Sequence, residues 1–246
     1  MFLDDTGIVL RVVRYDDASS VAHIFTRSHG TVPFMVTRPR SRRVRGVPTS
    51  ALLSPLAILA FEWDNKPTST LFRMRDTRPA IVWQSIPYHP LKRPVVLMLS
   101  EYLSAMLRES SDDALLFDHI ADSLHWLDDA SDDTPLGNFH LVFLLTVARF
   151  LGVAPDTDTF VPGHSFDIES AHFVPWAPAS PLVVKPSDAD ILYRLTCTDY
   201  ATMSSVRMAR TDRTRLLTYL NRFFAVHLPA FPEPKSLDVL EDLFSD

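Results

Sequence analysis

Five arginines crowd into one short segment of the chain, TRPRSRRVRGVP, at residues 37–48. They are Arg38, Arg40, Arg42, Arg43 and Arg45. A guanidinium group stays charged and donates hydrogen bonds in a planar fork, so it can grip two oxygens of one phosphate group. Pro39, Gly46 and Pro48 interrupt regular structure, which predicts a loop. The segment therefore indicates a phosphate-binding loop, and its contacts to a nucleic-acid backbone would not depend on base sequence.

A second pair of arginines widens this basic surface. Arg73 and Arg75 alternate with Phe72 and Met74 in a stretch of strand character, so the two guanidinium groups would share one exposed face. The opposing interpretation of residues 37–48 is a solvated loop without a ligand. The predicted DNA-binding residues are Arg11, Arg14, Arg38, Arg40, Arg42, Arg43, Arg45, Arg73 and Arg75.

Charge is distributed unevenly along the chain, whose net charge is −6. Residues 1–79 hold 12 Lys+Arg and 7 Asp+Glu, whereas residues 80–246 hold 12 and 23. A basic part joined to an acidic remainder suggests one module that binds a polyanion and another with a different task. Aromatic side chains near the basic part, such as Phe34 or Tyr15, could stack on bases.

Motifs of common enzyme classes do not occur in the sequence. It has no G-x-S-x-G, no P-loop and no H-E-x-x-H, and six glycines are too few for a Gly-rich phosphate loop. The best metal candidate is one face of an expected helix with Asp118, Asp122, His125 and Asp129. Ile120, Leu124 and Leu127 lie on the opposite face, which favours a solvated side of an amphipathic helix over a metal site.

The remaining metal and targeting signals are weak. Cys197 is the only cysteine, so an intramolecular disulfide and a cysteine-based zinc site are excluded, and His164 and His172 lack enough partners for zinc. The longest apolar run, residues 141–152, is too short to span a bilayer and contains Arg149. We expect no cofactor and no membrane partner. Because the N-terminus does not resemble a signal peptide, we also expect a cytoplasmic, nucleoid-associated location.

The first eighty residues have the pattern of a small β-barrel. The stretches GIVLRVVRY, VAHIFTRSHGTVPFMVTR, PLAILAFEWD and STLFRMRDTR predict five short strands, with a turn at His29-Gly30. Five antiparallel strands that close on themselves describe a barrel of the OB type, a shape that often binds oligonucleotides. The chain is therefore predicted to be α+β, with an OB-fold DNA-binding domain at residues 1–80.

Helical spacing dominates residues 81–246, the predicted helical domain. It begins near residue 90, and Ser111 is expected to cap a second helix that runs from Asp112 to Asp128. A third helix, Asn138–Leu151, is apolar almost all round and is expected to be buried. Further helices are expected near Ser187, at 213–224 and at 236–244. Between them, the proline-rich insertion at 155–186 contains SFDIES and AHFVPW, which could pair as a hairpin.

Four segments, in this order, resemble the RecO family of bacterial recombination mediators, and the resemblance covers nearly the whole chain. They are TGIVLRVVRYDDASSVAHIFTRSHGTVPFMV, LLSPLAILAFEW, NFHLVFLLTVARFLGVAP and FFAVHLPAFPEPKSLDVLEDLF. The resemblance implies an N-terminal OB-fold, an α-helical domain and no enzymatic activity. It also implies binding of single- and double-stranded DNA, annealing of complementary strands, and partnership with RecR. Contact with the C-terminal tail of the single-stranded DNA-binding protein would then help to load RecA onto coated strands.

The resemblance also sets expectations for two sites. Many members hold zinc on four cysteines in the segment that lines up with 155–186, and none of these cysteines is present, so aromatic side chains must hold this insertion. Those available are Phe160, Phe166, Phe173 and Trp176. Tail recognition in the family uses an apolar pocket with a basic residue, and here Gly137 and Asn138 stand at that basic position. Arg108 or Arg149 would then supply the base.

Two other functions remain open on the sequence alone. One is an adaptor whose OB barrel binds a protein partner and touches DNA weakly, which the acidic C-terminal two thirds would suit. The other is a metal-dependent hydrolase built on the Asp118, Asp122 and His125 face.

Overall fold

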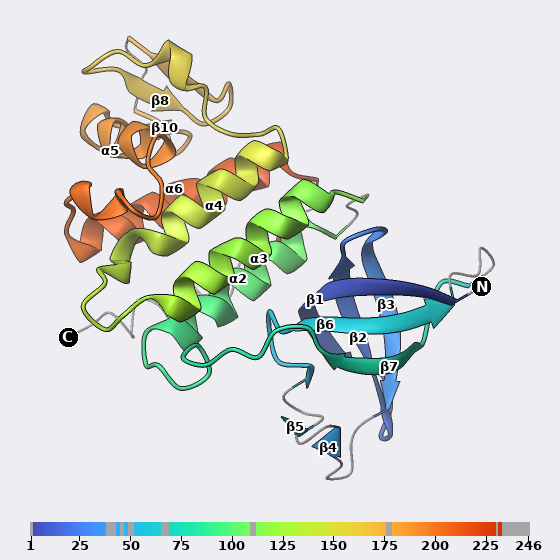
Figure 1. Ribbon diagram of the computed structural model, residues 1–246. Coiled ribbons are helices and arrows are strands. Elements are labelled where there is room, and N and C mark those ends of the chain that lie inside the picture. The colour runs from blue at the N-terminus through green and yellow to red at the C-terminus, as the bar shows by residue number, and fades with distance from the viewer. Residues whose placement is uncertain are drawn as a thin grey trace. The chain divides into compact units, whose positions relative to one another are not determined.

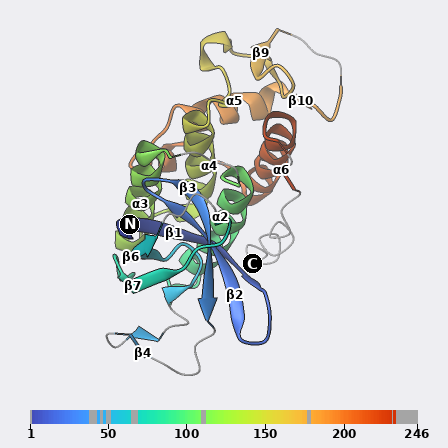
Figure 2. The same ribbon diagram turned by 90° about the vertical axis from the view of Figure 1, so that its right-hand side faces the viewer.

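The computed structural model describes residues 2–37, 43–44, 47–48, 52–64, 69–108, 112–175, 179–229 and 231–232 (Figures 1 and 2). The chain forms two compact units, Met1–Ala130 and Ser131–Asp246. Contacts therefore group the first two long helices with the N-terminal sheet, although the element type changes near residue 80. Within the described ranges, no helix has the length and apolar character needed to cross a membrane.

A five-stranded antiparallel sheet closes on itself in the first unit. Its strands are β1 (Phe2–Arg14), β2 (Ser19–Thr26), β3 (Gly30–Thr37), β6 (Ile58–Asp64) and β7 (Met74–Pro79), in the order β3-β2-β1-β6-β7. The two edges meet where Met35 N donates to Phe72 O at 2.8 Å and Phe72 N donates to Pro33 O at 3.1 Å, in a parallel bridge. This closure gives the barrel the OB-fold arrangement, and the predicted α+β fold is confirmed.

The barrel interior is filled by large apolar side chains from every strand pair. Phe34 lies at the centre, with ring centroids 5.2 Å from Phe61 and 5.4 Å from Trp63 in edge-to-face geometry. Gly7 on β1 leaves room for this packing, because a Cβ at that position would lie 2.3 Å from Ile24 Cγ2. Phe34 is fully buried, so the expectation that it could stack on bases is wrong; Tyr15 is 66% exposed.

Two helices complete the first unit, α2 (Lys92–Met106) and α3 (Ala114–Asp129). Helix α2 packs against β1, and Ser100 Oγ donates a hydrogen bond to Leu10 O. Helix α3 is capped by Asp113, whose carboxylate accepts from Leu116 N at 2.9 Å. The predicted cap, Ser111, lies outside the described residues, and the cap that the structure describes is Asp113, which reaches the first turn equally well.

A buried carboxylate at the end of α3 fixes the connection between the barrel and α2. Asp128 accepts hydrogen bonds at 2.8 Å from the backbone N–H groups of Gln84, Ser85 and Ile86. Burial raises the pKa of Asp128, but these backbone hydrogen bonds outweigh burial and hold the pKa below its ordinary value. The loop 84–86 therefore folds around an ionised carboxylate.

Lys92, at the start of α2, binds the same end of α3 from its other side. Its Nζ donates to Ser85 Oγ at 2.7 Å, to Asp128 O at 2.9 Å and to Ala130 O at 2.6 Å, and its side chain is only 1% exposed. A buried ammonium group needs such a set of acceptors, and the carbonyls at a helix C-terminus carry the complementary partial charge. The two helices are thus joined by charge as well as by apolar packing.

The second unit is built around α4 (Phe139–Phe150), with α5 (Pro186–Thr196) and α6 (Arg210–His227) packed on it. Nine residues of α4 are buried, as its nearly continuous apolar sequence predicts. Gly152, with φ +73°, ends the helix in the left-handed conformation that glycine adopts without strain. The expected last helix at 236–244 lies outside the described residues.

A small sheet of β8 (Ser165–Asp167), β9 (His172–Val174) and β10 (Val183–Val184) lies beside α5 (Figures 1 and 2). β8 pairs with β9 antiparallel, which confirms the predicted hairpin. The Phe160 ring stacks on Tyr193 at 3.8 Å and meets Phe173 edge-on at 5.2 Å, while Phe166 lies 5.0 Å from Phe173. Aromatic packing therefore holds this insertion; Trp176 lies outside the described residues.

We predict that Asp128→Asn lowers the free energy of unfolding by about 3 kcal/mol, because it removes a charged acceptor and points an amide at buried N–H donors. The lowered pKa of Asp128 makes its contribution present above the unfolded-state pKa and lost as pH falls through the folded-state pKa. Urea unfolding between pH 7 and pH 3 should therefore show less acid destabilisation in the variant than in wild type. Equal stability of the two proteins at pH 7 would contradict this role.

Candidate nucleic-acid interface

The arginine segment is inserted between two barrel strands, β3 and β6. Within it, β4 (Arg43–Val44) pairs antiparallel with β5 (Val47–Pro48), with Arg43 opposite Pro48, so the predicted loop contains a short ladder. Of the side chains in the predicted set, those of Arg38, Arg40, Arg42, Arg43 and Arg45 lie outside the described residues. Val36, just before the segment, packs against the barrel core, and Leu52, just after it, is buried in the core. Their contact with DNA stays a prediction.

Arg73 and Arg75 lie on the solvent side of the strand that closes the barrel. Both are exposed, whereas the alternating residues Phe72 and Met74 pack against the core, as the sequence pattern predicts. The Arg75 guanidinium lies 4.3 Å from the centroid of the Phe2 ring, a cation–π contact that holds the side chain against the barrel wall. The two charges are thus presented from a rigid strand.

Arg11, His23 and Arg108 form a local cluster of basic groups in the first unit. Arg11 is paired with His23 across β1 and β2, and Arg108 follows the end of α2. Burial and then the charge of Arg108 lower the pKa of Arg11; burial and then the two arginines lower the pKa of His23. Among the described residues, neither arginine forms an ion pair with a carboxylate, so their mutual repulsion favours an external anion.

Two further arginines of the first unit, Arg14 and Arg27, each form an ion pair with a carboxylate. Arg14 pairs with Asp17 in the following turn, and both side chains are exposed. Arg27 on the β2–β3 turn holds Asp118 of α3 through two hydrogen bonds, of 2.8 and 2.7 Å. Arg11 and Arg14, which the sequence assigns to one patch, therefore differ: Arg11 faces other cations, and Arg14 is already paired.

The candidate metal face on α3 is not assembled as a metal site. Hydrogen bonding from Arg27 lowers the pKa of Asp118, and this carboxylate is occupied by a guanidinium. Ile120, Leu124 and Leu127 are buried, as expected for the inner face of an amphipathic helix. Within the parts of the chain that the structure describes, no group of three or more His, Cys, Asp or Glu is placed to hold a metal ion.

The residues of the insertion do not fit the family's zinc site either. Four thiolates would be needed, and Cys197, which follows α5, is the only cysteine in the chain. His172 lies 3.4 Å from Asp156 through its Nε2, and its Nδ1 contacts Ser170 O. Half-buried Phe160 packs edge-on against buried Phe173 in this insertion, and the absence of zinc stays a prediction.

Comparison with known proteins identifies the family on both parts of the chain. Residues 1–83 match the family model described as Recombination protein O N terminal, and residues 95–237 match that described as Recombination protein O C terminal. The chain belongs to the RecO family. A DNA repair protein RecO of Phocaeicola vulgatus is 38% identical over 245 residues and is covered completely by this chain. Those of Porphyromonas gingivalis and Flavobacterium psychrophilum are 31% and 29% identical, again over the full length of each relative.

In this RecO family member, the Arg213 guanidinium lies beside Gly137 and Asn138, the position at which the sequence itself has no basic residue. A Cβ on Gly137 would lie 2.9 Å from the Arg213 Cζ, and Arg213 Nε donates to Asn138 Oδ1 at 2.8 Å. Asn138 is itself fixed, since its Nδ2 donates to Met203 O and Val206 O. The sequence alone could not show this, because Arg213 comes from α6 and no local spacing links it to Gly137.

The two arginines that the sequence offers for tail binding, Arg108 and Arg149, stay untested predictions. Arg149 Nη2 donates to Thr196 O at 2.6 Å, so its guanidinium joins α4 to α5. Arg108 belongs to the basic cluster of the first unit. Burial lowers the pKa of Arg213, against the opposing charge of Asp212. Arg213 is therefore a partly desolvated cation, a state in which its interaction with a carboxylate is strengthened.

Arg213 also affects a buried histidine in the same RecO unit. His140, on α4, is 4% exposed, and burial followed by the charge of Arg213 lowers its pKa to about 4. The imidazole is therefore neutral in the folded protein at neutral pH. Its unfolded-state pKa is about 6.5, so the unfolded chain takes up a proton below that pH before the folded protein does.

We predict that His140 lowers stability as pH falls from about 6.5 to 4, by up to roughly 3 kcal/mol at about 1.36 kcal/mol per pKa unit. In His140→Gln this component is absent, so the difference in unfolding free energy between variant and wild type should shift in favour of the variant by that amount. Urea titrations at several pH values measure it. A difference that is constant with pH would show that His140 does not titrate in this range on unfolding.

Proposed function

We propose that this RecO family member is a non-enzymatic mediator of recombinational DNA repair. It binds single- and double-stranded DNA through the barrel and anneals complementary strands. With RecR, it helps to load RecA onto DNA that is coated by the single-stranded DNA-binding protein. Family membership supports the overall role, and RecR and the coating protein enter as partners through that membership alone.

The observation that carries the DNA-binding proposal is the pair of exposed arginines on an OB barrel into which the sequence inserts an arginine-rich segment. Val36 before this segment is half-buried against the barrel core, and Leu52, a few residues after it, is buried there. Arg73 and Arg75 are exposed on the closing strand, and Arg11 lies beside another cation. Arginines so placed can bind phosphates without reading bases, as annealing of any complementary pair requires.

For the coating protein's acidic C-terminal tail, Arg213 is the proposed basic contact in place of Arg108 or Arg149. Its guanidinium fills the space beside Gly137 and is positioned by Asn138. The adjacent Phe139 ring is fully buried and stacks on the half-buried Tyr200 ring at 4.9 Å, so Tyr200 is the aromatic ring that could accompany the charge. A carboxylate-ended apolar tail needs both features.

The adaptor function is the second candidate, supported by the negative balance of residues 80–246, which hold 12 Lys+Arg and 23 Asp+Glu. Strong, salt-sensitive binding to DNA would separate the mediator from an adaptor that touches DNA weakly. The hydrolase function has less support, because Arg27 occupies the Asp118 carboxylate.

We predict that replacing Arg40, Arg42, Arg43 and Arg45 together by Ala weakens binding to all single-stranded sequences alike. Each lost phosphate contact reduces the slope of log K against log salt by about 0.7, so the slope should become shallower by about 2.8. Fluorescence-anisotropy titrations at several salt concentrations measure this.

The matched control replaces the same four residues by Lys. This variant keeps the charge but loses the planar fork, so its salt slope should stay near that of wild type while affinity falls modestly. If the alanine variant has the wild-type slope, the segment is a solvated loop, and the DNA surface has to be sought first at Arg73 and Arg75.

A further inference from the structure

Positive charge in the acidic second unit is concentrated on helix α6. Residues 131–246 hold 9 Lys+Arg and 15 Asp+Glu, and four of the nine basic residues lie on this one helix. Arg213 faces Gly137, whereas the other three line a groove of about 520 Å³ along α6, namely Arg210, Arg215 and Arg222. Thr211, Thr214, Thr218 and Tyr219 complete the lining of this groove, which we call the α6 groove.

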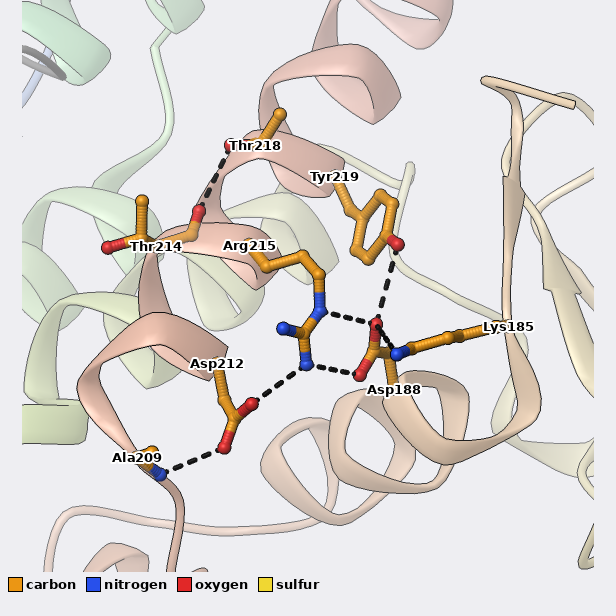
Figure 3. Close-up of polar contacts among 8 residues, drawn as sticks. All are labelled: Lys185, Asp188, Ala209, Asp212, Thr214, Arg215, Thr218 and Tyr219. Atoms are coloured by element: carbon orange, nitrogen blue, oxygen red, sulfur yellow. Dashed lines mark hydrogen bonds and ion pairs between the residues drawn. The ribbon is translucent and has the colours of Figure 1, made fainter.

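A buried carboxylate fixes the central arginine of the α6 groove. Asp188, at the start of α5, is 1% exposed and accepts from Arg215 Nε at 2.6 Å and from Arg215 Nη2 at 2.7 Å (Figure 3). Asp212 accepts from the same Nη2 at 2.8 Å, and Lys185 Nζ lies 3.9 Å from Asp188. A guanidinium held by two carboxylates loses little further entropy when it binds a ligand.

The third nitrogen of Arg215 remains for a ligand. Figure 3 shows Nη1 on the side of the guanidinium opposite Asp188, and among the described residues it has no hydrogen-bond partner. Thr214 and Thr218 lie on the same helix face, one helical turn apart, and add hydroxyl groups to the groove. The arrangement offers a positioned N–H donor between two further arginines.

The dimensions of the α6 groove suit a polymer of phosphates. Arg210 and Arg222 are twelve residues apart on α6, which is about 18 Å along a helix axis at ~1.5 Å per residue. This length exceeds the span of one phosphate group, so it can take more than one phosphate of a single strand. A single small phosphate would contact only a part of the groove.

The chemistry of the lining favours a nucleic-acid backbone over an acidic peptide. Of the described residues that line the α6 groove, none is acidic and none is aliphatic. Arginine clusters bind acidic peptides as well as phosphates, but a peptide groove commonly adds apolar anchor pockets, and the described lining has no aliphatic residue to form one. Arg and Thr side chains are common donors to phosphate oxygens. Tyr219, the one aromatic residue, directs its hydroxyl to Asp188 at 3.4 Å.

We propose that the α6 groove is a second contact for the phosphodiester backbone of single-stranded DNA, separate from the barrel. The proposal rests on the proposed DNA-binding function and extends it to the helical unit. Arg215 binds a phosphate oxygen through Nη1, and Arg210 binds a neighbouring phosphate. Arg222, whose Nη1 donates to Pro181 O at 3.0 Å, binds another phosphate through its remaining nitrogens. Contacts of this kind are independent of base sequence.

The test uses the full chain and a fluorescently labelled oligo(dT), titrated by anisotropy at several salt concentrations. The groove variant is Arg210→Ala with Arg222→Ala; Arg215 stays, because its loss would leave buried Asp188 unpaired. The matched control is Arg194→Ala with Arg207→Ala, which removes two exposed arginines of the same unit outside the groove. Thermal unfolding of each variant checks that folding is unaltered.

We expect the groove variant to make the salt slope shallower by about 1.4, at roughly 0.7 per lost contact, and the control to leave it unchanged. Thr214→Glu, which adds a carboxylate to the lining of the groove, should weaken binding, and Thr214→Ser should not. A groove variant that matches the control would overturn the proposal. So would binding of inorganic phosphate that the groove variant abolishes while oligo(dT) binding is retained, since the groove would then serve a small anion.

Combination with the alanine variant of the arginine segment separates this proposal from the proposed function. If both variants reduce the slope and their effects add, two independent contacts exist. If the segment variant reduces the slope and the groove variant does not, DNA binding stands and the α6 groove is rejected. If wild type binds no DNA, the proposed function and the groove both fail.

Discussion

Two backbone hydrogen bonds, from Met35 N to Phe72 O and from Phe72 N to Pro33 O, close the N-terminal sheet into a barrel. Closure buries Phe34 and Trp63 and removes the free sheet edges, which would otherwise invite association. Closure also determines which side chains of the closing strand are exposed, because successive side chains of a strand point alternately to the core and to solvent. Arg73 and Arg75 are exposed for this reason. The arginine segment leaves the barrel between β3 and β6, so the same closure holds both of its ends.

Carboxylates in this protein mainly position cations and backbone. Asp128 organises the loop 84–86, and Asp188 holds Arg215 in a fixed orientation. Removing a guanidinium from such a pair leaves a buried charge, whereas removing an exposed arginine costs little stability. The exposed arginines are therefore the groups that can serve ligands. A chain of net charge −6 can still present a basic surface because residues 1–79 hold 12 Lys+Arg and only 7 Asp+Glu.

Sequence patterns predicted the elements because each has a local cause. The apolar circumference of α4 and the alternation around Arg73 required no knowledge of distant residues. Prediction from sequence fails where the contacting residue is distant along the chain, or where two alternatives suit the same position almost equally well. Phe34 has a strand periodicity that fits either face until the barrel closes, and Asp113 caps α3 although Ser111 is also a residue type that caps helices. Arg213 reaches Asn138 across 75 residues, and no spacing in one sequence reveals such a contact.

The proposed mediator role requires this RecO family member to act on DNA without catalysing a chemical reaction. The most direct measurement is the rate at which two complementary single strands anneal when both are coated with the cognate single-stranded DNA-binding protein. It is made with a chelator present and without any nucleotide triphosphate. If the protein is a mediator, the full chain accelerates annealing under these conditions. A rate equal to that of the coated strands alone, or acceleration only when metal or nucleotide is added, would contradict it.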